Sequence, residues 1–176
     1  MANEERHWDT NLKSSEPRYG TDAKTLGIDR PKHIELLNLW NRIRGDRRAP
    51  TKEEFDPSDV RTLLGSIFLV ERLDDGDYFY RVVGTTIVSH VGFESSRKRL
   101  SELESFVDTN RIRQHFDDVV SRNMPRYDFA SGPWCGREWQ YYHRLLLPLS
   151  TDGETVTHIL GLVDIETTSA PDSGSG

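Results

Sequence analysis

The residues that most often bind metals or carry out catalysis are sparse in this chain of 176 residues, which holds six histidines and one cysteine. The single cysteine, Cys135, excludes an intramolecular disulfide and a cysteine zinc cluster. The sequence contains no GxSxG, HExxH or P-loop spacing. We interpret His143, beside Tyr141 and Tyr142, as a satisfied polar group in a packed sheet, with a metal site as the alternative. We therefore expect no catalytic residue, no metal site and a protein that is not an enzyme.

The stretch SIFLVERLDDGDYFYRVVG, residues 66–84, predicts a β-hairpin. Asp75-Gly76 separates two β-rich runs, and this dipeptide is typical of a type I′ turn. Tyr78, Tyr80 and Val82 share one face of the second strand by alternation, and we expect that face to point inward.

Helix signals precede and follow this hairpin. Pro31–Arg44 reads as an amphipathic helix that ends at Gly45. Pro57–Leu64 reads as a short helix capped by Asp56. Asp108 caps a longer predicted helix, TNRIRQHFDDVVSRN, which ends before Pro125.

The last third of the chain is rich in strands. The candidate strands are Tyr127–Ala130, Glu138–Leu149 and Val156–Ile165, with a tight turn at Asp152-Gly153. Leu145, Leu146 and Leu147 are consecutive apolar residues, whereas a half-exposed antiparallel strand alternates. We therefore expect the sheet to be covered on both faces.

The stretch FDPSDVRTLLG together with residues 66–84 resembles a PAS-domain family of small stand-alone bacterial proteins, over roughly Leu36 to Ile165. The resemblance implies an α+β fold with a PAS-like five-stranded antiparallel sheet. Helices are inserted between strands 2 and 3, and an N-terminal helix flanks the sheet. It also implies a sensory or ligand-binding module without naming the ligand.

We place the domain at residues 28–166. Residues 1–27 are expected to be a disordered or loosely attached tail, and residues 167–176 a disordered polar tail. The chain shows no kinase, cyclase or helix-turn-helix segment, so we expect any output to pass through a signalling partner or through self-association.

Two cofactors are known in PAS relatives, and we expect neither here. In haem-binding relatives the iron-bound histidine lies on the helix that corresponds to the one carrying His115. We favour a solvent-edge or capping histidine, because His115 lies about 100° from Phe116 on the predicted stripe. Cys135 lies in a PWCGRE segment rather than in the helical Asn-Cys-Arg-type motif of flavin-binding relatives.

A small-molecule cavity is expected between the sheet and the inserted helices. Its candidate lining residues come from the hairpin, the segment after it, the long helix and a late strand: Phe68, Tyr80, Val82, Ile87, Val91, Phe116 and Tyr142. Both strand faces are apolar, so Leu69 and Tyr141 remain alternatives to Phe68 and Tyr142.

The helix Pro31–Arg44 is predicted to pack on the outer sheet face and to contribute to a homodimer. Its candidate interface residues are Leu36, Leu39, Trp40 and Ile43. The reason is that a helix of about 21 Å can shield two or three strands but not five. The alternative is a monomer in which the tail, with Trp8 and Tyr19, folds back over the sheet.

Composition narrows the functional classes. A net charge of −6 and a pI of about 5.5 argue against binding to nucleic acid. The sequence has no membrane-length apolar run and no apolar leader, so we expect a cytoplasmic protein. We favour a sensory module that binds a small molecule or a protein partner. The alternatives are a small isomerase or hydratase and a purely structural dimerisation module.

Overall fold

A computed structural model describes residues 16–131 and 140–167 of the chain. Short helical pieces and one long helix separate an early hairpin from a three-stranded meander. The elements are β1 (Arg18–Tyr19), α1 (Ala23–Leu26), α2 (Pro31–Arg44), η1 (Lys52–Glu54), η2 (Pro57–Ser66), β2 (Ile67–Arg72), β3 (Tyr78–Val83), α3 (Thr85–Val91), η3 (Leu100–Leu103), α4 (Thr109–Arg122), β4 (Arg126–Ser131), β5 (Gln140–Ser150) and β6 (Val156–Thr167).

One antiparallel sheet has the strand order β1-β4-β5-β6-β2-β3. Strands β2 to β6 are the five strands that were predicted, with α3, η3 and α4 inserted between the second and the third of them. The predicted α+β fold class is therefore confirmed. The additional strand β1 lengthens the sheet at its β4 edge.

The β2–β3 hairpin forms at the predicted place but with a different turn. The Leu73 N–H donates to the Asp77 carbonyl at 2.8 Å, and the Gly76 N–H donates to the Leu73 carbonyl at 3.0 Å. Gly76 has a positive φ of 85°, whereas Asp75 does not have a positive φ. A type I′ turn needs positive φ at both central residues. The turn is therefore a three-residue loop that closes on a left-handed glycine, and the type I′ prediction is wrong.

Helix α2 forms with the predicted bounds and packs on one face of the sheet, called here the outer face. Leu36 and Trp40 are fully buried, and Leu39 is 6% exposed. The Trp40 indole Nε1 donates to the Pro148 carbonyl at 2.9 Å, which ties the helix to β5. The half-buried Ile43 packs at the edge of the same cluster. The burial of Leu36, Leu39 and Trp40 in the core of one chain contradicts their assignment to a dimer interface, while the half-buried Ile43 and dimerisation itself stay predictions.

The ordered structure begins earlier than residue 28. Strand β1 pairs with β4, and the Gly20 N–H donates to the Pro125 carbonyl at 3.2 Å. Leu26 of α1 is fully buried in the outer cluster. The prediction of a loose tail is therefore wrong for residues 16–27. The predicted tail was 167–176, but Thr167 is the last residue of β6, and Trp8, Cys135 and residues 168–176 lie outside the described residues.

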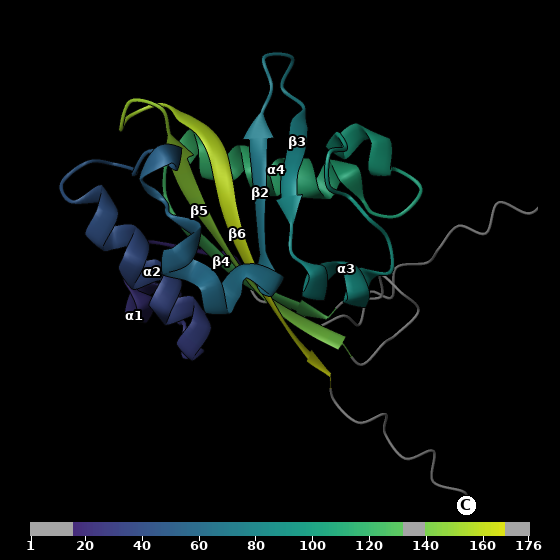
Figure 1. Ribbon diagram of the computed structural model, residues 1–176, viewed down its shortest axis with the longest axis horizontal. Coiled ribbons are helices and arrows are strands. Elements are labelled where there is room, and N and C mark those ends of the chain that lie inside the picture. The colour runs from purple at the N-terminus through teal and green to yellow at the C-terminus, as the bar shows by residue number, and fades with distance from the viewer. Residues whose placement is uncertain (1–15, 132–139, 168–176) are drawn as a thin grey trace, which may run out of the picture.

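The two faces of the sheet carry separate apolar clusters. The outer cluster joins α1, α2 and η2 to Leu145 and Leu147 of β5. The inner cluster joins α3, η3 and α4 to Leu146, which lies between those two leucines in sequence. All three leucines are fully buried. In Figure 1, α2 and α4 lie on opposite sides of the strands, which confirms the two-sided cover that was predicted.

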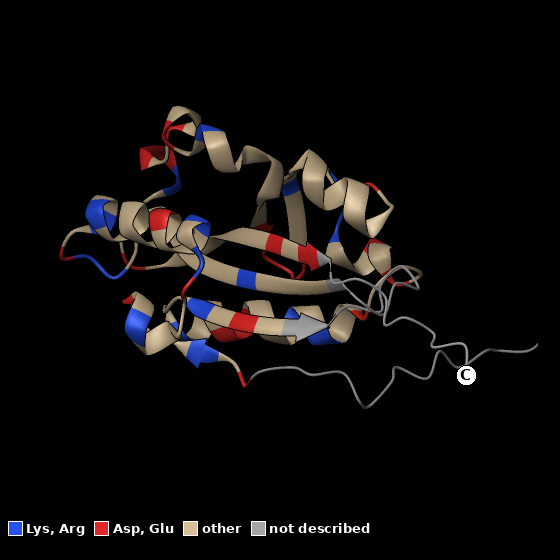
Figure 2. Ribbon diagram, turned by 90° about the horizontal axis from the view of Figure 1, so that it is seen from below, with Lys and Arg blue, Asp and Glu red and all other residues tan. Residues whose placement is uncertain are grey.

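Charged positions are interspersed over the surface elements. Figure 2 shows Lys and Arg on several helices and strands, with Asp and Glu among them. Within residues 16–131 and 140–167, no helix is long and apolar enough to cross a membrane.

The burial of Trp40 leads to a stability prediction. Trp40→Ala should lower the free energy of unfolding by about 3–5 kcal/mol, because it removes a buried ring and leaves a cavity. Urea denaturation followed by circular dichroism measures the change. Val82→Ala, at a position that is 55% exposed, is the control and should shift stability by less than about 0.5 kcal/mol. A Trp40→Ala protein with wild-type stability but a lower sedimentation coefficient would instead restore the interface assignment.

Candidate functional site

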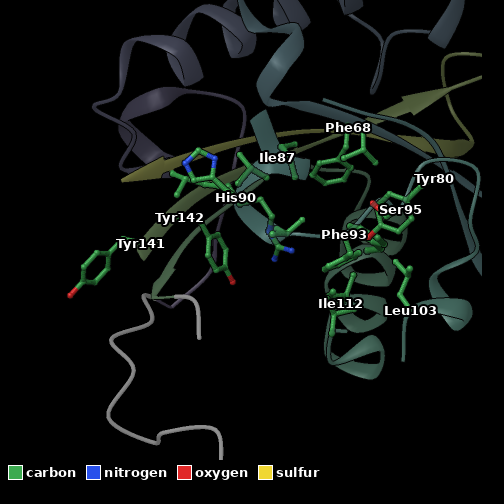
Figure 3. A pocket seen from close by; sticks show the side chains of 17 residues that line it. Phe68, Tyr80, Ile87, His90, Phe93, Ser95, Leu103, Ile112, Tyr141 and Tyr142 are labelled. Carbon is green, nitrogen blue, oxygen red and sulfur yellow. The ribbon is translucent and has the colours of Figure 1, made fainter. Parts of the chain in front are cut away.

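A cavity of about 100 Å³ lies between the inner face of the sheet and the segments from α3 to α4. Strands β2, β3, β5 and β6 supply one wall, and α3, η3 and α4 supply the other. Figure 3 shows side chains from both walls converging on this space. The sheet and the helices inserted between β3 and β4 thus enclose the region where the sequence predicted a cavity.

Six of the seven predicted lining residues lie on this cavity: Phe68, Tyr80, Ile87, Val91, Phe116 and Tyr142. Figure 3 places the Tyr142 hydroxyl toward the interior and the Tyr141 ring pointing away from it. This arrangement follows from the alternation of β5.

Val82 is the predicted residue that does not line the cavity, because a β-bulge precedes it. Leu69 pairs with Val82 and Val70 pairs with Tyr80, so Arg81 is an extra residue without a partner in β2. The extra residue reverses the alternation of side chains. Tyr80 remains inward, Val82 becomes 55% exposed, and Val83 takes the inward position. The assignment of Val82 is therefore corrected to Val83.

Most of the other lining residues are apolar and complete the walls. The unpredicted apolar residues are Val83, Phe93, Leu103, Val107, Ile112, Val163 and Ile165. The unpredicted polar residues are His90, Ser95 and Arg144, and Tyr141, the named alternative to Tyr142, also belongs to the lining. Val163 and Ile165 lie two residues apart on β6, and Arg144 lies two residues after Tyr142 on β5. The period of two could therefore have found these three residues once one inward residue on each strand was known.

A glycine on β6 determines how one aromatic ring lies in the inner cluster. Gly161 pairs with Phe68 across β2 and β6. A Cβ atom at Gly161 would lie 2.1 Å from the Phe68 ring, closer than any real contact. The ring therefore occupies the space that a side chain on β6 would take.

The polar end of the cavity is Arg144, whose side chain is buried. Its Nε donates to Asp128 Oδ1 at 3.1 Å and its Nη2 donates to Asp128 Oδ2 at 2.7 Å. Asp128 lies directly opposite Arg144 in the β4–β5 ladder. The pairing is bidentate, which is the strongest arrangement of these two groups. Burial alone would raise the pKa of Asp128, but the Arg144 and Arg126 guanidiniums outweigh burial and lower this pKa.

A second arginine shares the same carboxylate. Arg126 lies two residues before Asp128 on β4, and its Nη2 donates to Asp128 Oδ2 at 3.2 Å. Its Nη1 lies 3.3 Å from Asp118 Oδ2, on a side chain that is 46% exposed. Arg126, Asp128 and Arg144, called here the buried triad, have side chains that are at most 8% exposed. Two guanidiniums and one carboxylate give the buried triad a net charge of +1.

His115 of α4 completes the surroundings of Arg144. Its Nδ1 lies 2.6 Å from Arg144 Nη2. Since a guanidinium only donates, Nδ1 accepts, and the ring proton of the neutral imidazole is on Nε2. Burial and the adjacent Arg144 lower the pKa of His115 to about 3. His115 is therefore an acceptor for Arg144 rather than a capping residue, which corrects that interpretation.

Comparison with known proteins agrees with the fold. A family model of the PAS domain matches residues 28–164, most of the chain. The chain belongs to the PAS-domain family. A comparison with curated proteins found no match. The resemblance seen in the sequence is thus confirmed, and membership makes this PAS domain a sensory or regulatory module in general terms.

The cofactor ligands considered for this PAS domain are placed as follows. His115 does not belong to the lining of the cavity between the sheet and the helices. His143 lies near the outer face, where its Nδ1 is 3.0 Å from the Tyr127 hydroxyl and its Nε2 is 3.4 Å from Glu166 Oε2. Within residues 16–131 and 140–167, no group of three His, Cys, Asp or Glu could hold a metal ion.

The position of His115 leads to a pH prediction. The folded-state pKa of about 3 lies below the ordinary value of 6.5. The stability that neutral His115 contributes is therefore complete above pH 6.5 and is lost as the pH falls toward 3. In His115→Asn an amide oxygen can accept from Arg144 without titrating.

Urea unfolding between pH 6.5 and 4 should show a steeper loss of stability in wild type than in His115→Asn. The pKa of buried His33 is also lowered, to about 4, but this histidine is present in both proteins and cancels in the comparison. Parallel stability curves for the two proteins would contradict the prediction.

Proposed function

We propose that this PAS domain is a sensory module that binds a small molecule in the inner cavity and signals its occupancy to a protein partner. The observation that carries the proposal is the cavity itself. Its lining is predominantly apolar, comes from both walls, and has the buried Arg144 at its polar end. Apolar walls with a few convergent polar groups are the general pattern of a small-molecule site.

The energetics of packing support a role for this space. Protein interiors are close-packed, with few voids larger than a water molecule. The apolar side chains that line the cavity of about 100 Å³ lack packing partners on that side, which forfeits dispersion contacts. A compact occupant would recover this loss and would bind the folded chain selectively.

The charge states near the cavity favour sensing over catalysis. The described residues that line it include no Asp or Glu. The nearest buried carboxyl, Asp128, has a lowered pKa and is held as the charged partner of two arginines. A general acid at neutral pH needs a raised pKa instead. These features support a binding module rather than a small isomerase or hydratase.

The sheet offers a physical link from the cavity to the opposite face. Tyr142 and Leu146 of β5 face the inner side, while Leu145 and Leu147 of the same strand pack in the outer cluster with α2. An occupant that shifts β5 therefore changes the surface on which α2 rests. We place the readout by a partner at the outer layer for this reason.

The experiment combines native mass spectrometry of the purified protein with an NMR titration. The probe is pentan-1-ol, a compact and mostly apolar molecule. We expect its chemical-shift changes to gather at α3, α4 and the inner positions of β5. Ile87→Trp should abolish these changes, because the larger side chain fills the cavity.

Val82→Trp is the matched control, since it adds the same ring at an exposed position outside the cavity. It should bind pentan-1-ol as wild type does. Folded wild-type protein that carries no small molecule and shows no cavity-specific shifts would contradict the proposed function.

A further inference from the structure

The guanidinium of Arg144 has one nitrogen that the protein does not use. Nε and Nη2 bind Asp128, and Nη2 also meets His115 Nδ1. Among the described residues, no acceptor lies within hydrogen-bond distance of Nη1. The fully buried side-chain nitrogens without a partner among the described residues are His33 Nδ1 and Arg126 Nε, so Arg144 Nη1 is not shut off and a water or ligand can reach its two N–H groups. Arg144 is therefore partly satisfied, on a side chain that lines an otherwise mostly apolar cavity.

The charge around the cavity is positive. The buried triad has two guanidiniums for one carboxylate, and Asp118, the further partner of Arg126, is half-exposed, so water screens its charge. His115 is neutral and does not change this net charge. The Tyr80 and Tyr142 hydroxyls also line the cavity, and burial raises the pKa of both, so they remain uncharged.

A neighbouring hollow provides a contrast. It lies between α4 and β4, has a volume of about 320 Å³, and is lined on both sides by charged groups. Its acidic residues are Glu16, Asp118 and Asp128, which accompany Arg111 and Arg126. A carboxylate there would meet like charges, whereas Arg144 is the only Lys, Arg, Asp or Glu among the described residues that line the inner cavity. The inner cavity is thus the better anion site, although it is the more apolar of the two.

We infer that the ligand of the inner cavity is a compact apolar carboxylate, whose carboxylate accepts hydrogen bonds from Arg144 Nη1. This inference rests on the proposed function, because it names the class of molecule that the same cavity binds. The apolar body lies against residues such as Phe68, Ile87 and Phe116. The cavity volume of about 100 Å³ favours a body of a few carbon atoms.

The test compares three probes of matched length by NMR titration: pentanoate, pentanamide and pentan-1-ol. A hydrogen bond between charged groups predicts that pentanoate binds roughly tenfold to hundredfold more tightly than pentan-1-ol at pH 7. Pentanamide should lie between them. The Arg144 guanidinium protons should shift with pentanoate, which a purely structural role of this arginine would not produce.

Two variants locate the effect. Arg144→Gln leaves Asp128 without its bidentate partner and can unfold the protein. The double variant Arg144→Gln/Asp128→Asn is therefore tested as well. In this variant the two amides can form a hydrogen bond between β4 and β5. The double variant, once circular dichroism shows that it is folded, should lose the preference for pentanoate over pentan-1-ol. Arg81→Gln is the control, since Arg81 is an exposed arginine on β3 that pairs with Glu71, and it should keep the preference.

The outcomes separate the two proposals. If pentan-1-ol binds in the cavity but pentanoate binds no more tightly, the carboxylate assignment is overturned and the sensory proposal stands. The same holds if the double variant keeps the preference for pentanoate. If no probe shifts the cavity signals of the folded wild type, both proposals are overturned.

Discussion

The sheet must be buried on both faces, and the rest of the architecture depends on this constraint. Leu145, Leu146 and Leu147 follow one another in β5 and are all fully buried, so neither face can be open to water there. On the outer face one long helix, α2, lies beside α1 and η2. On the inner face the cover consists of the short α3 and η3 together with α4. Each face is thus covered by one helix of 14 residues with shorter elements beside it, and the cavity lies under the inner cover.

Local signals in the sequence were sufficient for most of the elements. Helix α2 has the predicted bounds because Pro31 opens it and Gly45 closes it. Asp56 and Asp108 cap the helices that they were expected to cap, by accepting from backbone N–H groups two and three residues later. The consecutive leucines of β5 predicted a second layer without indicating which elements would form it. These signals depend on neighbouring residues only, so one sequence is enough to recognise them.

The features that were missed depend on pairing between distant segments. The bulge at Arg81 exists only in the register of β3 against β2, and alternation alone therefore selected Val82 instead of Val83. Arg144 finds Asp128 only through the β4–β5 register. Strand β1 is two residues long and has no periodicity to detect, so its pairing with β4 could not be predicted. The site thus combines predictable aromatic and aliphatic positions with an ionic group that only the assembled sheet creates.

Arg144 imposes on any ligand a requirement that the rest of the cavity does not. Burying a guanidinium is costly unless its donors are paired, and Asp128 offsets that cost for Nε and Nη2 only. Water can serve Nη1 in a cavity of this size, so a ligand acceptor gains only the difference between itself and that water. A carboxylate makes this difference in free energy large, because its negative charge compensates the net charge of +1 on the buried triad. The apolar walls contribute a separate part of the binding free energy, because the hydrocarbon body of the ligand leaves water when it packs against them. A molecule that has only the anionic end, or only the hydrocarbon body, would lack one of these two contributions to binding. Affinity and selectivity therefore both depend on an anionic end joined to a compact hydrocarbon body.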